Sequence, residues 1–327
     1  MNLFSRFFSC FLPVPPPSPD IQSGLERIAA LVDKKFAVMP DFDERLAAPV
    51  AHAREFCARM VDVLPPAVTI DRRSFASDPL VHALFASADD IGAMLAASEA
   101  LQSWLAAPEV RLEDSFIGLM VARRADKKVL GVAMQGEIVM SDVPQTLLQF
   151  ADQALILPAS DAASARAAFL EAAFDSLLLA FAGHLARARE AYSALQTERD
   201  MERVRQRSRP TDTAFPERRI AALDERLQQQ FQSLQPDTVI DELAAFLMRP
   251  EQALSLDPVR LWVTRSGVIQ EDAHHDADAA PILFMEFTSR DRRRHLVLPV
   301  RVRYDEAREA LARTKEIQAA RKYMFLL

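Results

Sequence analysis

The sequence predicts an α+β protein that is predominantly α-helical: a helical bundle with a long antiparallel helical hairpin and a small antiparallel sheet built from β-hairpins. Three observations lead to this class. A helical pattern runs without a break over 161–208. The chain has only seven glycines among its 327 residues, so it offers few sites for tight turns. Apolar and polar residues alternate in two separate stretches, which is typical of strands.

The first 20 residues predict an apolar and proline-rich tail. Phe7, Phe8 and Phe11 precede five prolines, and the apolar run is too short for a membrane span or a secretory signal. We therefore expect a loosely ordered or core-docked tail. Peripheral membrane contact through Phe7, Phe8 and Phe11 is the first alternative, and export is the second.

Residues 21–110 predict a helical region. Apolar residues recur at helical spacing over 21–38 and again over 42–64, where Pro65 and Pro66 end the pattern. A third helix is predicted to open at Asp78, which can cap it, and to continue to Leu105. Gly92 marks a possible break in that helix.

Residues 111–158 predict a β-hairpin region. The pattern suggests strands over 116–124 and 129–134, joined by a charged turn at 125–128, with further strands over 137–140 and 147–157. Because two strands alone are marginal in water, this hairpin must pack on helices or join a larger sheet.

Residues 159–235 predict a long helical hairpin of the coiled-coil type. Ser160 or Asp161 can cap the long helix, whose first half is apolar on most faces and should be buried nearly all round. Charged residues in that half favour a core helix over a membrane span. Beyond Phe181 the apolar stripe narrows, and a return helix is predicted over 216–234.

Residues 236–327 predict an α+β C-terminal region. A helix over 236–247 should be followed by strands over 259–263, 282–288 and 296–302, and by a final helix over 304–323. The hairpin over 282–298 resembles the first hairpin in outline. We use this similarity only to predict that both lie in one sheet, and leave open whether it records a duplication.

Composition excludes several classes of protein. Two cysteines rule out a disulfide framework and a zinc site made mainly of thiolates, and they favour a reducing, cytoplasmic location over an oxidising one. Peripheral attachment to the inner membrane remains the alternative location. A formal net charge of −7 gives no general attraction to nucleic acid, which is therefore not a favoured partner.

His274, His275 and Asp276 form the densest group of potential metal ligands. Imidazole and carboxylate groups together suit zinc, manganese or iron. Neighbouring side chains in a polar connection tend to diverge, however, so a solvated loop is the favoured interpretation, and we predict no cofactor. A metal-assisted hydrolase of unknown substrate is the alternative that this group allows.

Arg292, Arg293 and Arg294 lie in the strongest concentration of positive charge. Such a group can bind anions, which leaves an anion-binding regulator using an arginine-rich β-hairpin as another alternative. The chain is acidic overall, so a solvated or salt-bridged turn is the favoured interpretation.

The sequence favours a non-enzymatic interaction protein: an adaptor, a chaperone-like factor or an assembly factor. It contains no nucleophile elbow, no zinc-binding His-Glu-x-x-His helix and no phosphate-binding loop, so no catalytic residue is predicted. Apolar stripes on the helical hairpin suggest binding of a protein partner or a second copy. The predicted interaction residues are Leu185, Tyr192, Leu195, Leu223, Leu227 and Phe231.

Overall fold

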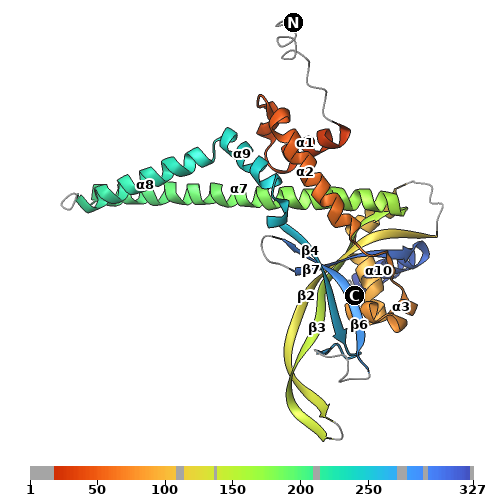
Figure 1. Ribbon diagram of the computed structural model, residues 1–327. Coiled ribbons are helices and arrows are strands. Elements are labelled where there is room, and N and C mark those ends of the chain that lie inside the picture. Colours follow the sequence, from red (N-terminus) through yellow and green to blue (C-terminus); the bar gives the residue numbers. More distant parts are fainter. Residues whose placement is uncertain are drawn as a thin grey trace, which may run out of the picture. The chain divides into compact units, whose positions relative to one another are not determined.

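The computed structural model describes residues 18–107, 114–135, 138–208, 214–270, 278–289 and 294–324 (Figure 1). The chain is an α+β protein with ten α-helices and a seven-stranded sheet in the described residues. It divides into two compact units: Met1–Phe56 with Phe174–Pro250, and Cys57–Ala173 with Glu251–Leu327. The five regions expected from the sequence stay a prediction.

The first unit is helical in its described part. Its elements are α1 (Pro19–Leu31), the 3₁₀ helix η3 (Lys34–Val38), α2 (Phe42–Asp62) up to Phe56, α7 (Ala162–Ser208) from Phe174, α8 (Ala214–Ser233) and α9 (Pro236–Leu247); the 3₁₀ helix η4 (Pro250–Gln252) follows α9.

Helix α1 approaches α2 closely at Gly24. A Cβ atom built on Gly24 would lie 2.5 Å from Cγ1 of Val50, so only glycine fits without a shift. Arg45 of α2 forms ion pairs with Asp237 and Asp241 of α9, at 3.0 and 2.6 Å. Phe181 of α7 packs against Phe246 of α9, with ring centroids 5.3 Å apart. These contacts join α1 to α2, and α9 to both α2 and α7.

The second unit is built on the sheet. Its strands are β1 (Val68–Thr69), β2 (Ser115–Gln135), β3 (Ile138–Ala159), β4 (Leu254–Val263), β5 (Ile269–Gln270), β6 (Ala280–Ser289) and β7 (Arg294–Arg303). The order is β3-β2-β7-β6-β4-β5, and these neighbours are antiparallel, whereas β1 pairs with β7 in parallel. Because β2 pairs with β7, the prediction that both β-hairpins share one sheet is confirmed.

Strand β2 shows how the sheet separates two cores. Phe116 and Met120 are buried in a cluster with residues of α4, α5 and α6, while Ile117 and Leu119 are buried in a second cluster with Val61 and Phe169. Successive side chains of a strand point to opposite faces, so one sequence supplies both cores.

The predicted third helix is wrong as a single element. The structure has α3 (Arg72–Ser77), α4 (Pro79–Leu84), α5 (Ala88–Ala97) and α6 (Glu99–Ala106). Asp78 caps α4 as expected, accepting hydrogen bonds from the backbone N–H groups of Leu80 and Val81. Ser98 caps α6 by accepting from Leu101, and Gly92 lies inside α5. Local capping therefore breaks the chain where the apolar pattern continues.

The predicted turn at 125–128 is also wrong. Strand β2 passes straight through these residues, and Asp126 and Lys127 pair with Leu148 and Leu147 of β3. The pairing with β7 ends at Arg123. Beyond that point β2 pairs with β3 alone, and the two form a ribbon that Figure 1 shows as two long arrows. Asp126, Lys127 and Lys128 are tolerated in this strand because they are exposed to solvent.

Helix α7 begins after Asp161, as expected. The Asp161 carboxylate accepts a hydrogen bond from the backbone N–H of Ser164 at 2.9 Å, and hydrogen bonds from Ser164 lower the pKa of Asp161. The prediction that the first half of α7 is buried nearly all round is wrong. Phe174, Leu177 and Phe181 are buried, whereas Leu179 is 54% exposed. Among the described residues, α7 is the one helix whose length and apolar content would suffice to cross a membrane.

The chain ends with α10 (Tyr304–Met324). Tyr304 packs against Phe116 of β2 and Trp104 of α6, with ring centroids 5.3 and 5.7 Å apart. This aromatic group fixes the start of α10 against the sheet in the second unit.

Candidate functional site

The pairing of α7 with α8 is the first candidate site. Tyr192 lies 6.4 Å from the ring of Phe231, and the side-chain amide of Gln230 donates a hydrogen bond to the carbonyl oxygen of Ala188. Nearer the C-terminal end of α7, Arg219 pairs with Glu198 at 3.0 Å. Later residues of α8 thus meet earlier residues of α7.

Charged groups occupy part of this contact. Glu202 of α7 is only 6% exposed and pairs with Arg205 at 2.7 Å and Arg219 at 3.5 Å. The hydrogen bond to Glu198 and the charge of Glu202 raise the pKa of Arg219. Asp224 pairs with Arg203 at 3.3 Å. These pairs favour one alignment of the two helices, because sliding either helix would leave a charge without its partner.

The predicted interaction residues differ in their exposure. Leu185, Leu223 and Leu227 are buried by the chain itself. Tyr192 and Leu195 are half-buried, and Phe231 is 50% exposed. Only the last three therefore present surface to a partner in this structure.

A groove follows the α7–α8 contact. It has a volume of about 600 Å³. From α7 it is lined by Ala191, Ala194, Leu195 and Glu198, and from α8 by Arg226, Gln229, Gln230 and Ser233. The two alanines make the α7 wall shallow, while polar groups line the α8 wall.

The predicted anion-binding residues lie at the start of β7. Arg294 is exposed, with Nε 3.7 Å from a carboxylate oxygen of Glu286 on β6. Glu286 is buried and also pairs with Arg124 of β2 at 3.2 Å. Burial of the Arg124 guanidinium opposes its charge, but Asp126 and Glu286 outweigh burial and raise its pKa. Arg292 and Arg293 lie outside the described residues.

Other predicted residues also fall outside the described part of the chain. These are the potential metal ligands His274, His275 and Asp276, and the tail residues Phe7, Phe8 and Phe11. Within the part that the structure describes, no three His, Cys, Asp or Glu side chains are grouped to hold a metal ion.

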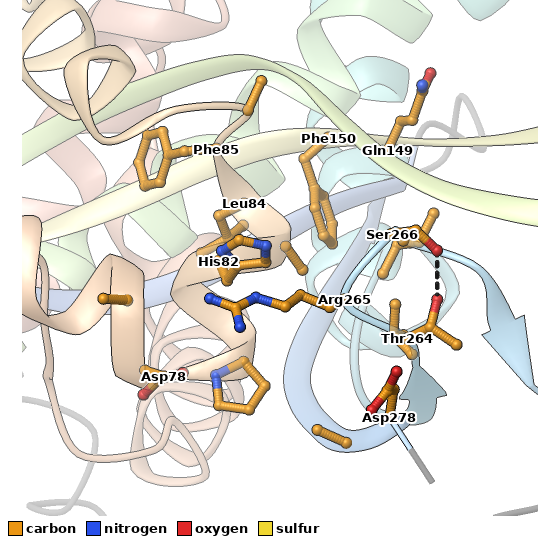
Figure 2. Close-up of a pocket in the computed structure, with 18 of the residues that line it drawn as sticks. Asp78, His82, Leu84, Phe85, Gln149, Phe150, Thr264, Arg265, Ser266 and Asp278 are labelled. Atoms are coloured by element: carbon orange, nitrogen blue, oxygen red, sulfur yellow. Dashed lines mark hydrogen bonds between the residues drawn. The ribbon is translucent and has the colours of Figure 1, made fainter. Parts of the chain in front are cut away.

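A cavity in the second unit escaped sequence analysis. It has a volume of about 500 Å³ and lies between α4, β3 and the turn that joins β4 to β5. Figure 2 shows His82 and Arg265 pointing into it from opposite walls. No sequence pattern indicated this arrangement, because α4, β3 and the β4–β5 turn are well separated in the chain and neither residue lies in a motif.

Comparison of the chain with known protein families, curated proteins and solved structures finds no match. The functional argument therefore rests on the geometry of the chain.

Proposed function

We propose that the protein is a non-enzymatic interaction protein, acting as an adaptor, a chaperone-like factor or an assembly factor. In this proposal α7 and α8 form a long antiparallel helical hairpin that binds a protein partner. The observation that carries the proposal is the groove along these helices, with its shallow wall at Ala191 and Ala194.

The spacing of contact residues supports the hairpin. Leu185, Ala188, Tyr192 and Leu195 follow one another at steps of three and four along α7, as do Leu223, Leu227 and Gln230 along α8. Such spacing places side chains on one face of a helix. The ion pair between Arg219 and Glu198 supports the antiparallel direction.

The groove suits an amphipathic helix as its occupant. Small side chains on one wall allow a helix backbone to approach closely, since the distance between packed helices depends on the side chains at the contact. Half-exposed Phe231 and partly exposed Tyr192 add apolar surface on the same pair of helices. Recognition of an amphipathic helix in a groove is a common mode of protein binding, and the polar α8 wall of this groove suits the polar side of such a helix.

A pair of arginine substitutions tests the proposal. Ala194→Arg puts a long charged side chain into the groove, whereas Ser193→Arg puts the same side chain at an exposed neighbouring position outside its lining. We expect Ala194→Arg to reduce recovery of the native partner at least about 10-fold, because the long side chain would fill the space that the partner helix occupies. Ser193→Arg should leave recovery unchanged.

The measurement is quantitative affinity capture from the native host, followed by titration with the purified partner. Sedimentation of the purified protein alone shows whether a second copy is the occupant. Both variants must keep the parent melting temperature. Equal recovery of every partner by the two variants would rule out the groove as the binding surface.

The proposal places this interaction in the cytoplasm. Cys57 is a buried thiol, which is compatible with a reducing compartment. Peripheral attachment to the inner membrane through Phe7, Phe8 and Phe11 is the competing location. Cell fractionation of the full chain and of a Phe7→Ser/Phe8→Ser/Phe11→Ser variant distinguishes the two, because only attachment through these residues predicts a shift from membrane to soluble fractions.

A further inference from the structure

The cavity in the second unit combines an apolar wall with converging polar groups. Leu84, Phe85, Phe150 and Val263 supply apolar surface, and all four are buried by their packing. A volume of about 500 Å³ is within the range of small-molecule sites. Such sites typically pair mostly apolar walls with a few fixed polar side chains.

Arg265 is held by a tight turn. The Gly267 N–H donates to the carbonyl oxygen of Thr264 at 2.9 Å, and the Val268 N–H donates to the Thr264 hydroxyl at 3.0 Å. Gly267 has a φ of +87°, a conformation that favours glycine. Its carbonyl oxygen accepts a hydrogen bond from the Leu148 N–H of β3 at 2.8 Å. The base of the arginine side chain is therefore fixed against β3.

The guanidinium of Arg265 has no carboxylate within ion-pair distance among the described residues. Many other arginines of the chain do have one, including Arg45, Arg124 and Arg219. Figure 2 shows the Arg265 side chain extending across the cavity towards helix α4. Its planar fork of donors is thus available to an acceptor inside the cavity.

His82 presents a second polar group. Its Nδ1 lies 3.3 Å from the carbonyl oxygen of Phe75, and its ring packs against the Phe75 ring at 4.8 Å. Because a carbonyl oxygen only accepts, Nδ1 carries the proton in this contact. Nε2 is then the ring nitrogen left for a ligand.

The other charges limit what this cavity can bind. Asp78 and Asp278 also line it, and backbone N–H groups at the start of α4 compensate part of the Asp78 charge. With Asp278 in the same lining as Arg265, the cavity has no excess of positive charge for a phosphate dianion. One arginine matches one carboxylate in a bidentate pair. We infer that the cavity binds a small organic monocarboxylate whose apolar body lies against Phe85 and Phe150 and whose carboxylate pairs with Arg265.

Fluorine NMR of fluorobenzoate titrated with the full chain tests this inference. Fluorobenzamide has nearly the same shape without the charge and serves as the ligand control. Arg265→Gln removes the proposed partner, and Arg260→Gln is the matched protein control, because Arg260 is an exposed residue of β4 outside the cavity lining.

We expect the parent protein and Arg260→Gln to bind fluorobenzoate equally. Arg265→Gln should bind fluorobenzoate at least about 10-fold more weakly, as loss of a charge-assisted pair implies. The parent protein should bind fluorobenzamide as weakly as Arg265→Gln binds fluorobenzoate. Absence of fluorobenzoate binding to the parent would overturn the inference, as would equal binding by Arg265→Gln or displacement of fluorobenzoate by equimolar inorganic phosphate.

Discussion

The contact between Arg124 and Glu286 bears on whether the arginines near residue 290 bind anions or form salt bridges. Arg124 and Glu286 lie 162 residues apart in the chain and meet in the sheet, where both side chains are largely buried. The sequence indicated that the arginines near 290 could be either anion-binding or salt-bridged. Glu286 also pairs with Arg294, and this position of Glu286 favours the salt-bridged interpretation for Arg294.

Asp33 is a carboxylate whose charge is held by its neighbours. Burial would raise its pKa, but hydrogen bonds from the backbone N–H of Lys35 and from the Arg189 guanidinium outweigh burial, and its pKa lies below the usual value of 3.8. A lowered pKa means that the folded state favours the charged form. The resulting stability is present above the ordinary pKa and is lost as pH falls through the lower, folded-state value.

The substitution Asp33→Asn should therefore destabilise the protein only where Asp33 is charged. Asparagine keeps an acceptor for the Lys35 N–H but removes the ion pair with Arg189, which is 2.5 Å long. We expect a loss of about 0.5–1 kcal/mol at pH 7, which shrinks towards zero as pH falls below the ordinary value of 3.8 and through the lower, folded-state pKa. Urea unfolding across this range measures the loss, and a loss independent of pH would contradict the charge argument.

The ribbon of β2 and β3 is the most exposed apolar element of the second unit. Leu130, Val132 and Val139 are 70%, 61% and 64% exposed. Beyond the sheet, β2 pairs only with β3 among the described strands, so one edge of its backbone is unpaired there. Open strand edges with apolar side chains favour association between molecules. On β3, Pro144 interrupts the row of N–H donors.

Replacing Leu130 and Val139 by threonine should reduce self-association at high concentration without loss of stability. Threonine is β-branched, a shape that suits strands, and both side chains are exposed, so we expect the free energy of unfolding to change by less than about 0.5 kcal/mol. Light scattering and thermal unfolding measure the two effects. Leu148→Thr is the control: Leu148 of β3 is buried, so this substitution should lower the melting temperature. Unchanged light scattering by the Leu130/Val139 variant would contradict the prediction.

At the scale of elements, the sequence predicted most helices and strands but missed where local bonds interrupt them. Leu80, Leu84, Ile91, Leu95 and Leu101 are all buried, as the apolar pattern indicated. The sequence indicated that Asp78 starts a helix, but it could not show that Ser98 starts another, because the apolar pattern continues past Ser98 without a change of spacing. Nor could it show that Lys127 and Lys128 lie within a strand rather than a turn.

At the scale of the whole molecule, the sequence predicted the α+β class but not the assignment of segments to units. Each unit takes its residues from two separate stretches of the chain. Hydrophobic spacing reports local structure, and it does not indicate the register in which β2 pairs with β7 on one side and β3 on the other. The cavity around Arg265 was missed for the same reason, since α4, β3 and the β4–β5 turn meet only after the sheet has formed.

Truncation after Pro250 should leave the two units in different states. The shortened chain keeps every segment of the first unit but loses β4 to β7 and α10 from the second. We expect hydrogen exchange to remain slow in α1 and α9. It should become fast in β2 at Phe116 and Met120, because β2 loses its partner strand β7. Slow exchange retained in β2 would show that β2 and β3 fold without the C-terminal strands.

The pairing of β2 with β7 also has a consequence for biosynthesis. Gln135 ends β2, and its partner β7 begins at Arg294, so a ribosome must add more than 150 further residues before the partner exists. At typical rates of elongation this takes roughly 10–30 s. Throughout that interval the nascent chain carries apolar strands with no completed sheet, and this is when it would depend most on cellular chaperones.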